Sequence, residues 1–227
     1  MFPSEVLWFR GQAAHQNWPL VPAVHRDFDS EREKNMCQLF MSHAQVRRST
    51  TCPPVDQPGQ WLALMQHYGL PTRLLDWTES LLVAAYFAIA DHPSGDDGII
   101  WALAPGRMNQ HNGPEPGIYH VADPKVLKVI VPAFKGGMPL AETYAVFTPQ
   151  IDLRMMVQHG QYTLHGSPAP IEQHAHAEKF LRGFLIPWQS KLLMRGVLHI
   201  MGIHKANLFP DLHNLAHHLA EHHRPPK

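Results

Sequence analysis

Apolar residues follow two spacings along the chain, and each spacing predicts a different kind of element. Intervals of three and four residues, as between Met36, Leu39 and Phe40, place apolar side chains on one face of a helix. Short apolar runs that end at glycine or proline are typical of buried strands. By these criteria, helices are predicted over residues 27–48, 59–68, 81–90, 152–158, 189–201 and 211–222, and strands over residues 6–9, 72–77, 99–103, 126–131, 161–165 and 184–186.

The order of these elements predicts an α+β fold with a mixed β-sheet and flanking helices, because strands and helices are interspersed without regular βαβ alternation. Gly69 is expected to end the second helix, and Thr78 is expected to cap the start of the third. A chain of 227 residues can bury one substantial core. We therefore expect a single compact domain over residues 1–221 and a frayed tail over residues 222–227.

Charge and hydropathy narrow the classes of partner. The 19 Lys and Arg residues balance the 19 Asp and Glu residues, so a nucleic-acid site would need a local patch, for which Arg47-Arg48 with Lys125 and Lys128 are the candidates. No apolar run of about 18 residues is present, and the first residues do not form a signal peptide. We expect a soluble, cytoplasmic protein that does not span a membrane.

Cysteine and histidine usage gives no indication of a metal site. Cys37 and Cys52 have no CxxC spacing and are expected to be reduced thiols. The chain has 18 histidines, and His218 and His222 have the i, i+4 spacing that can chelate zinc on a helix. No acidic or cysteine partner completes a set of three or four ligands, so no metal is expected.

Arg10 is the first candidate for a binding residue. It ends a buried-looking strand and precedes Gly11, which allows another backbone or a ligand to approach closely. A guanidinium in this position can hold a phosphate or a carboxylate through two parallel hydrogen bonds. A structural salt bridge to Asp76 explains the same pattern equally well.

Two further groups of polar residues are candidates for the same site. In the predicted strand over residues 72–77, Asp76 is expected to be buried and to need an arginine or a ligand hydroxyl as partner. Across a later helix-to-strand junction, Gln158, Tyr162, Thr163 and His165 offer an amide, a phenol, a hydroxyl and an imidazole, a set suited to a ribose or an amide. For both groups, core packing is the alternative explanation.

The chain resembles the FRG-domain family in three places that span most of its length. The first is Phe9-Arg10-Gly11-Gln12, and the second runs from Trp61 through the segment His67-Tyr68-Gly69-Leu70-Pro71-Thr72-Arg73-Leu74-Leu75-Asp76-Trp77 to Ala88. The third extends from Arg154 to His165 and is followed by Leu208-Phe209-Pro210-Asp211-Leu212. The family is described as a set of domains whose activity is unsettled.

The order of these motifs is similar to that in ADP-ribosyltransferases. The similarity implies that Arg10 holds the phosphates of NAD as a substrate, that the middle strand supports nicotinamide and ribose, and that the late motif supplies catalysis. On this basis the residues expected to bind the ligand are Arg10, Gly11, Gln12, Arg73, Trp77, Thr78, Gln158, Tyr162 and Thr163. The position two residues after Gln158, where a catalytic glutamate is expected, is Gly160, so Asp76 or His165 would have to act instead.

The sequence therefore predicts a protein with a pocket for NAD or another nucleotide-like small molecule, with transfer of ADP-ribose or cleavage of NAD as the candidate reaction. A binding module without catalysis is one alternative. An enzyme or toxin directed at nucleic acid is the other.

Overall fold

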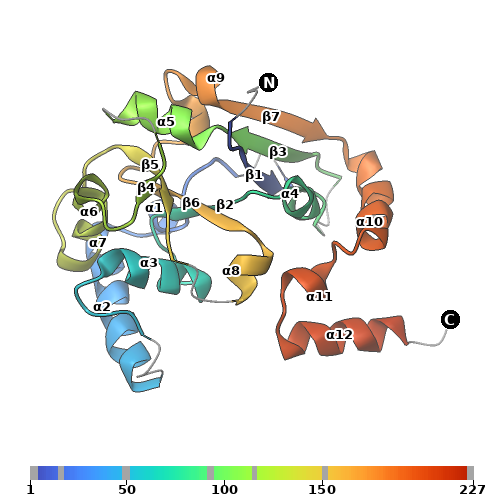
Figure 1. The fold of residues 1–227 in the computed structure, drawn as a ribbon, viewed down its shortest axis with the longest axis horizontal. Helices are drawn as coiled ribbons and strands as arrows, with labels where there is room; N and C mark the ends of the chain where they lie inside the picture. The colour runs from blue at the N-terminus through green and yellow to red at the C-terminus, as the bar shows by residue number, and fades with distance from the viewer. Residues whose placement is uncertain are drawn as a thin grey trace.

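A seven-stranded mixed sheet organises the chain in a computed structural model that describes residues 5–14, 18–47, 52–90, 95–113, 117–149 and 153–223 (Figure 1). The strand order is β4-β5-β6-β2-β1-β3-β7, and every pair is antiparallel except β4 with β5. The strands are β1 (Trp8–Gln12), β2 (Leu74–Thr78), β3 (Gly98–Leu103), β4 (Tyr119–His120), β5 (Thr143–Phe147), β6 (Gly160–His165) and β7 (Leu181–Ile186). The predicted α+β class with a mixed sheet is confirmed.

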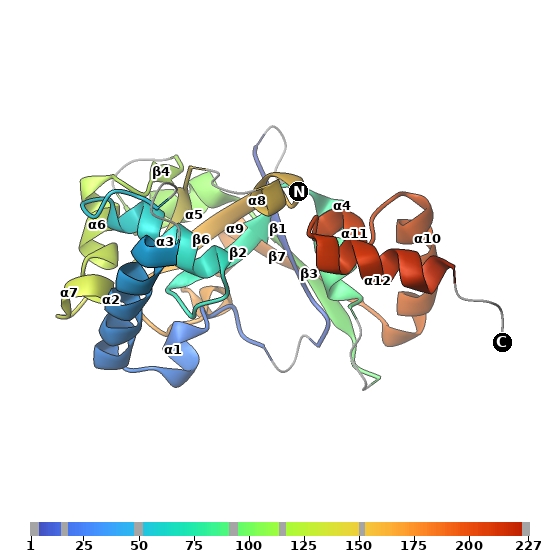
Figure 2. The ribbon, with the colours of Figure 1, turned by 90° about the horizontal axis from the view of Figure 1, so that it is seen from below.

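Helices gather at the two ends of the sheet (Figures 1 and 2). Near β4 to β6 lie α1 (Val24–Asp27), α2 (Ser30–Arg47), α3 (Pro58–His67), α6 (Pro124–Ile130) and α7 (Pro132–Lys135). At the opposite end lie α10 (Lys191–Ile200), α11 (Lys205–Leu208) and α12 (Leu212–His222). The remaining helices are α4 (Leu81–Ala88), α5 (Pro105–Asn112), α8 (Leu153–Val157) and α9 (Ala177–Phe180).

Most predicted elements are present within a few residues of their expected bounds, but one predicted strand and one predicted helix cap need correction. Residues 126–131 lie mainly in α6 instead of a strand, because the Asp123 side chain accepts a hydrogen bond from the Lys125 amide at 2.8 Å and starts a helix. Helix α4 is capped by Ser80 instead of Thr78, which belongs to β2. The pattern also missed α5 and β5.

At the end of the chain, α12 continues to His222, whereas the tail was expected from residue 222. Residues 224–227, like residues 48 and 152 of two predicted helices, lie outside the described residues. No helix in the described ranges combines the length and the apolar character needed to cross a membrane.

Helix α4 lies directly on the backbone of β1, and the sequence allows this because Gly11 has no side chain. A Cβ atom at Gly11 would lie 1.9 Å from the carbonyl oxygen of Ala84 and 2.5 Å from the amide nitrogen of Ala88. Gly98, at the start of β3, has the same relation to α4, since its Cβ would lie 2.2 Å from the Ala88 oxygen. Alanines on the helix and glycines on the strands therefore set the distance between α4 and the sheet.

A buried ion pair joins the start of β2 to α2. Arg73 and Glu33 are 2% and 3% exposed, and two nitrogens of the Arg73 guanidinium donate to the two carboxylate oxygens of Glu33, Nε to Oε1 at 2.7 Å. The third nitrogen donates to the Val129 carbonyl oxygen of α6 at 2.7 Å. One side chain therefore connects β2, α2 and α6.

Cys37 lies beside this ion pair, where burial and then the Glu33 carboxylate raise the pKa of its thiol to about 12. Both Cys37 and Cys52 are free thiols, in agreement with the sequence-based expectation.

Gly11→Ala is expected to lower the free energy of unfolding by about 3 kcal/mol or more, because the three nearest atoms that the new methyl group would meet all belong to the backbone of α4. Gly106→Ala, in the first turn of α5, is the matched control, since its Cβ would meet only one atom, at 3.9 Å. That control should be neutral or gain up to about 1 kcal/mol. Urea unfolding of both variants measures the difference, and equal stabilities would show that α4 can move away from β1.

Glu33→Gln is expected to cost about 3–5 kcal/mol of unfolding free energy, because it leaves the Arg73 charge buried without its counter-ion. Glu5→Gln makes the same change in the exposed Glu5–Arg107 pair and should cost less than about 1 kcal/mol. Thermal or urea unfolding measures the loss of stability in each of the two variants. Similar losses for both variants would contradict a structural role for the buried pair.

Candidate functional site

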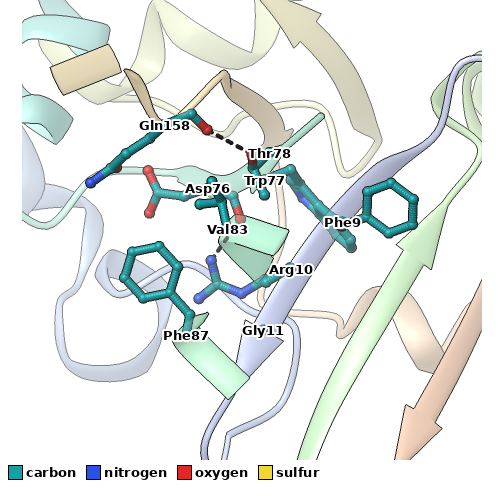
Figure 3. Close-up of a pocket in the computed structure, with 9 residues that line it drawn as sticks. All are labelled: Phe9, Arg10, Gly11, Asp76, Trp77, Thr78, Val83, Phe87 and Gln158. Atoms are coloured by element: carbon teal, nitrogen blue, oxygen red, sulfur yellow. Dashed lines mark hydrogen bonds between the residues drawn. The ribbon is translucent and has the colours of Figure 1, made fainter. Parts of the chain in front are cut away.

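The main candidate site is a cavity where β1 and β2 separate (Figure 3). The two strands pair at one register position, Phe9 opposite Thr78, and then diverge. The cavity has a volume of about 260 Å³. Its lining consists of Phe9, Arg10, Gly11, Asp76, Trp77, Thr78, Val83, Phe87 and Gln158.

Arg10 reaches across the gap between the strands. Its Nη1 donates to the backbone carbonyl oxygen of Asp76 at 2.6 Å, so the side chain satisfies an acceptor that a neighbouring strand would otherwise use. Its Nε is buried and has no hydrogen-bond partner among the described residues. Burial lowers the pKa of the guanidinium, and the Asp76 carboxylate acts in the opposite direction. Arg10 therefore makes its contact with the Asp76 backbone, and not the side-chain salt bridge that was one of the two alternatives.

The Asp76 carboxylate is exposed at the cavity and is held by a side-chain relay. Gln66 donates through Nε2 to Asp76 Oδ2 at 2.9 Å, and the Gln66 amide oxygen accepts from the Thr72 hydroxyl at 2.6 Å. The expectation of a buried Asp76 is wrong, because β2 turns this residue toward open space between two buried neighbours. Sequence reasoning also missed Gln66, which lies in α3, ten residues before Asp76. The two side chains meet because α3 packs against β2.

Apolar side chains form the rest of the cavity wall. Phe87 of α4 and Phe9 of β1 extend from neighbouring elements, and the Phe87 ring faces the space between Arg10 and Asp76 in Figure 3. Phe87 is supported from behind by an edge contact with Phe209, at 6.2 Å between ring centroids.

Gln158 and Thr78 connect the cavity to the C-terminal part of the chain. The Thr78 hydroxyl donates to the Gln158 carbonyl oxygen at 2.6 Å, and Gln158 Nε2 donates to the Leu208 carbonyl oxygen of α11 at 2.9 Å. Both residues line the cavity, but these hydrogen bonds are made to other parts of the protein framework. Gly160, two residues after Gln158, pairs with Thr78 across β6 and β2.

Other predicted ligand-binding residues lie in the protein interior, away from the cavity lining. Arg73 is held in the buried ion pair with Glu33. Gln12 donates to the Trp18 carbonyl oxygen at 2.9 Å and accepts from Trp101 Nε1 at 2.9 Å. Tyr162 is buried in the apolar cluster between the sheet and α6.

His165 and Thr163 belong to a buried chain of hydrogen bonds that begins at the cavity wall. Trp77 Nε1 donates to Thr163 Oγ1 at 3.0 Å, and that oxygen lies 2.9 Å from His165 Nε2. Thr163 and His165 are fully buried, so the structure does not bring His165 to the cavity as a candidate base. Desolvation, followed by the nearby His25 and Arg10, holds the pKa of His165 well below its ordinary value.

The described residues contain no group of three or more His, Cys, Asp and Glu side chains arranged to hold a metal ion. His218 instead stacks on His204, at 4.6 Å between ring centroids, and the His222 side chain lies outside the described part.

Acid is expected to destabilise the fold through the buried histidines His165 and His25. Both have lowered pKa values in the folded protein, so the unfolded chain binds their protons first. Above about pH 6.5 the free energy of unfolding is not reduced by these two histidines. Below that pH it decreases by about 1.4 kcal/mol per pH unit for each histidine that stays neutral when folded.

Unfolding titrations between pH 7.5 and 5 measure this slope. In His165→Gln the slope should decrease by about one proton, while His43→Gln, at an exposed position of α2, controls for the substitution itself. An unchanged slope in His165→Gln would contradict a neutral buried imidazole.

Comparison with known proteins adds one finding to this geometry. The model of the FRG domain matches residues 5–97, which include Arg10, Gly11, Gln66, Asp76 and Phe87 of the site. No curated protein and no solved structure matches the chain. Gln158 and the C-terminal elements lie outside the matched range. Residues 5–97 of the chain therefore match the FRG domain, and this part of the chain supplies most of the cavity.

Proposed function

We propose that the cavity between β1 and β2 binds a nucleotide-type ligand, with NAD as the leading candidate and Arg10 as the residue that holds its phosphates. The observation that carries the proposal is the Arg10 guanidinium, which lines the cavity with a buried Nε that has no partner among the described residues. A buried donor without an acceptor is costly, so a ligand that supplies an anionic oxygen here gains affinity.

The size of the cavity suggests how a dinucleotide would bind. Its volume of about 260 Å³ is just below the roughly 300–1,000 Å³ of typical ligand pockets. One end of NAD, a ring with its ribose, matches this space, and the remainder of the molecule would extend past Arg10 to the surface. The Phe87 ring offers an apolar face to a planar base, and the Asp76 carboxylate offers an acceptor to a ribose hydroxyl.

Asp76 is the candidate for catalysis if the ligand reacts. In transfer of ADP-ribose, the bond between nicotinamide and ribose breaks, nicotinamide leaves with the electron pair, and an acceptor attacks the ribose carbon. A carboxylate near the ribose stabilises the positive charge that develops on the sugar. Gly160 cannot do this, whereas Asp76 is exposed at the cavity and oriented by Gln66. With water as acceptor, the products are ADP-ribose, nicotinamide and a proton.

Gly160 also favours a second candidate function, which is ligand binding without turnover. Of the predicted site residues, Gln12, Arg73 and Thr163 use their polar groups within the fold, so few groups are left for chemistry. We expect either activity to operate in the cytoplasm.

Millimolar NAD is expected to raise the melting temperature of the wild-type protein. A ligand at 100 times its dissociation constant adds about 2.7 kcal/mol to the folded state, which corresponds to about 5–10 °C for a domain of this size. Arg10→Gln should lose most of this shift. Arg32→Gln makes the same change at an exposed position on α2 and should keep it.

ADP-ribose and AMP, measured in the same way, locate the recognised part of the ligand. If none of the three compounds shifts the melting of the folded wild-type protein, the nucleotide site is refuted. Release of nicotinamide from NAD, abolished by Asp76→Asn, would establish turnover. A thermal shift without nicotinamide release would leave the binding module as the function.

A further inference from the structure

Helix α10 has apolar side chains on two opposite faces. On one face, Leu198 and Met194 pack with α4, and Lys191 and Arg195 donate to backbone carbonyl oxygens of the body, Lys191 to that of Ala13 at 2.6 Å. The other face is exposed and consists of Leu192, Leu193, Val197 and Ile200, at 78%, 74%, 48% and 86% exposure. The first face attaches α10 to the body of the protein, and the second face has no partner in the described part of the chain.

Helix α12 presents a second exposed apolar row. It extends away from the sheet in both views of the fold (Figures 1 and 2). Leu212, Leu215 and Leu219 follow the i, i+3, i+7 spacing of one helical face and are 83%, 44% and 49% exposed. The helix is held near α10 and α11 by His218, whose ring stacks on His204 and lies 6.3 Å from His199.

The combined surface is large enough for a stable protein interface. A fully exposed aliphatic side chain of this size presents roughly 100 Å² of apolar area, so the seven side chains together expose roughly 500 Å². Because about 60% of a typical interface is apolar, this area corresponds to an interface of about 800 Å² per partner. This area is in the upper part of the range of about 300–600 Å² for the largest apolar patch on a typical monomer, and such patches often serve as interaction sites.

Nothing else in this sequence is long enough to cover the surface. The stretches outside the described ranges contain at most four residues each, too few to cover seven side chains on two helices.

The charge of the surface identifies its occupant. The exposed face of α10 consists of Leu192, Leu193, Gly196, Val197 and Ile200 and contains no charged residue. Lys191 and the exposed Arg195 donate to backbone carbonyl oxygens of the body from the other side of the helix. The apolar face therefore has no group complementary to a charged partner or an anionic membrane. The whole chain has zero net charge at pH 7, with His neutral, and two copies therefore do not repel one another. An uncharged apolar surface is complementary to itself, which is what a twofold interface requires.

We propose that a second copy of this chain covers the exposed faces of α10 and α12, so that the protein is a twofold homodimer. Gly196 supports this arrangement, because it lies between Leu192 and Ile200 on the exposed face and a Cβ there would meet no atom within 4 Å. The facing helix can therefore approach the α10 backbone closely. The inference does not depend on the ligand of the cavity between β1 and β2.

Sedimentation of the full chain at 1–100 μM and pH 7.5 tests the proposal. The wild type should reach twice the 25.7 kDa mass of one chain. The double variant L193E/I200E buries two charges in the interface and should weaken dimerisation at least 100-fold, leaving a single chain with unchanged circular dichroism and melting temperature. The matched control L39E/V46E changes two exposed apolar residues with the same seven-residue separation on α2 and should remain dimeric.

Three results would overturn the proposal. The first is a wild type that stays at 25.7 kDa up to 100 μM, whether or not it binds lipid vesicles. The second is a L193E/I200E variant that dimerises as tightly as the wild type. The third is assembly of the wild type into larger species without a dimer plateau, which would indicate an open contact instead of a twofold one.

Discussion

Strands β1 and β2 meet at a single pair of residues, Phe9 and Thr78, and the arrangement of the candidate site depends on their separation beyond that point. In a continued ladder, Gly11 would lie opposite Asp76. Instead, the Arg10 guanidinium occupies the gap and supplies the hydrogen bond that the Asp76 carbonyl oxygen would receive from a strand. The gap leaves room for a cavity, and α4 fixes one of its walls through contact with the β1 backbone.

Arg73 and Arg10, the two arginines in the motifs quoted from the sequence, differ in how far the fold explains them. Arg73 has a carboxylate partner with matching geometry and no exposure, so its charge stabilises the junction of β2, α2 and α6. Arg10 has one backbone acceptor and a donor left without a partner among the described residues. The contacts of Arg73 are explained by folding alone, whereas the donor of Arg10 that has no described partner is the basis of the proposed ligand site.

The sequence predicted the fold class, most elements and several of the residues that meet at the cavity, because these follow from local periodicity and from strand ends. It did not predict which side chains face the cavity. Asp76 was expected to be buried and His165 to be available, and the structure has the reverse, since exposure along β2 and β6 depends on which helices cover each face. Gln66 was missed because its contact with Asp76 requires the packing of α3 on β2. Residues 126–131 are apolar enough for a strand, and the helix is distinguished by the cap at Asp123 and by Pro124 at its first position.

The contact between Gly11 and α4 also limits how this site can be altered. Where two backbones touch at the base of a cavity, no side chain can be enlarged, shortened or recharged to suit a different ligand. Variation in ligand preference then depends on the other lining residues, among them Phe87, Asp76 and Gln158, which come from separate parts of the chain. Redirecting this protein to another ligand would therefore mean changing such side chains while Gly11 is left in place.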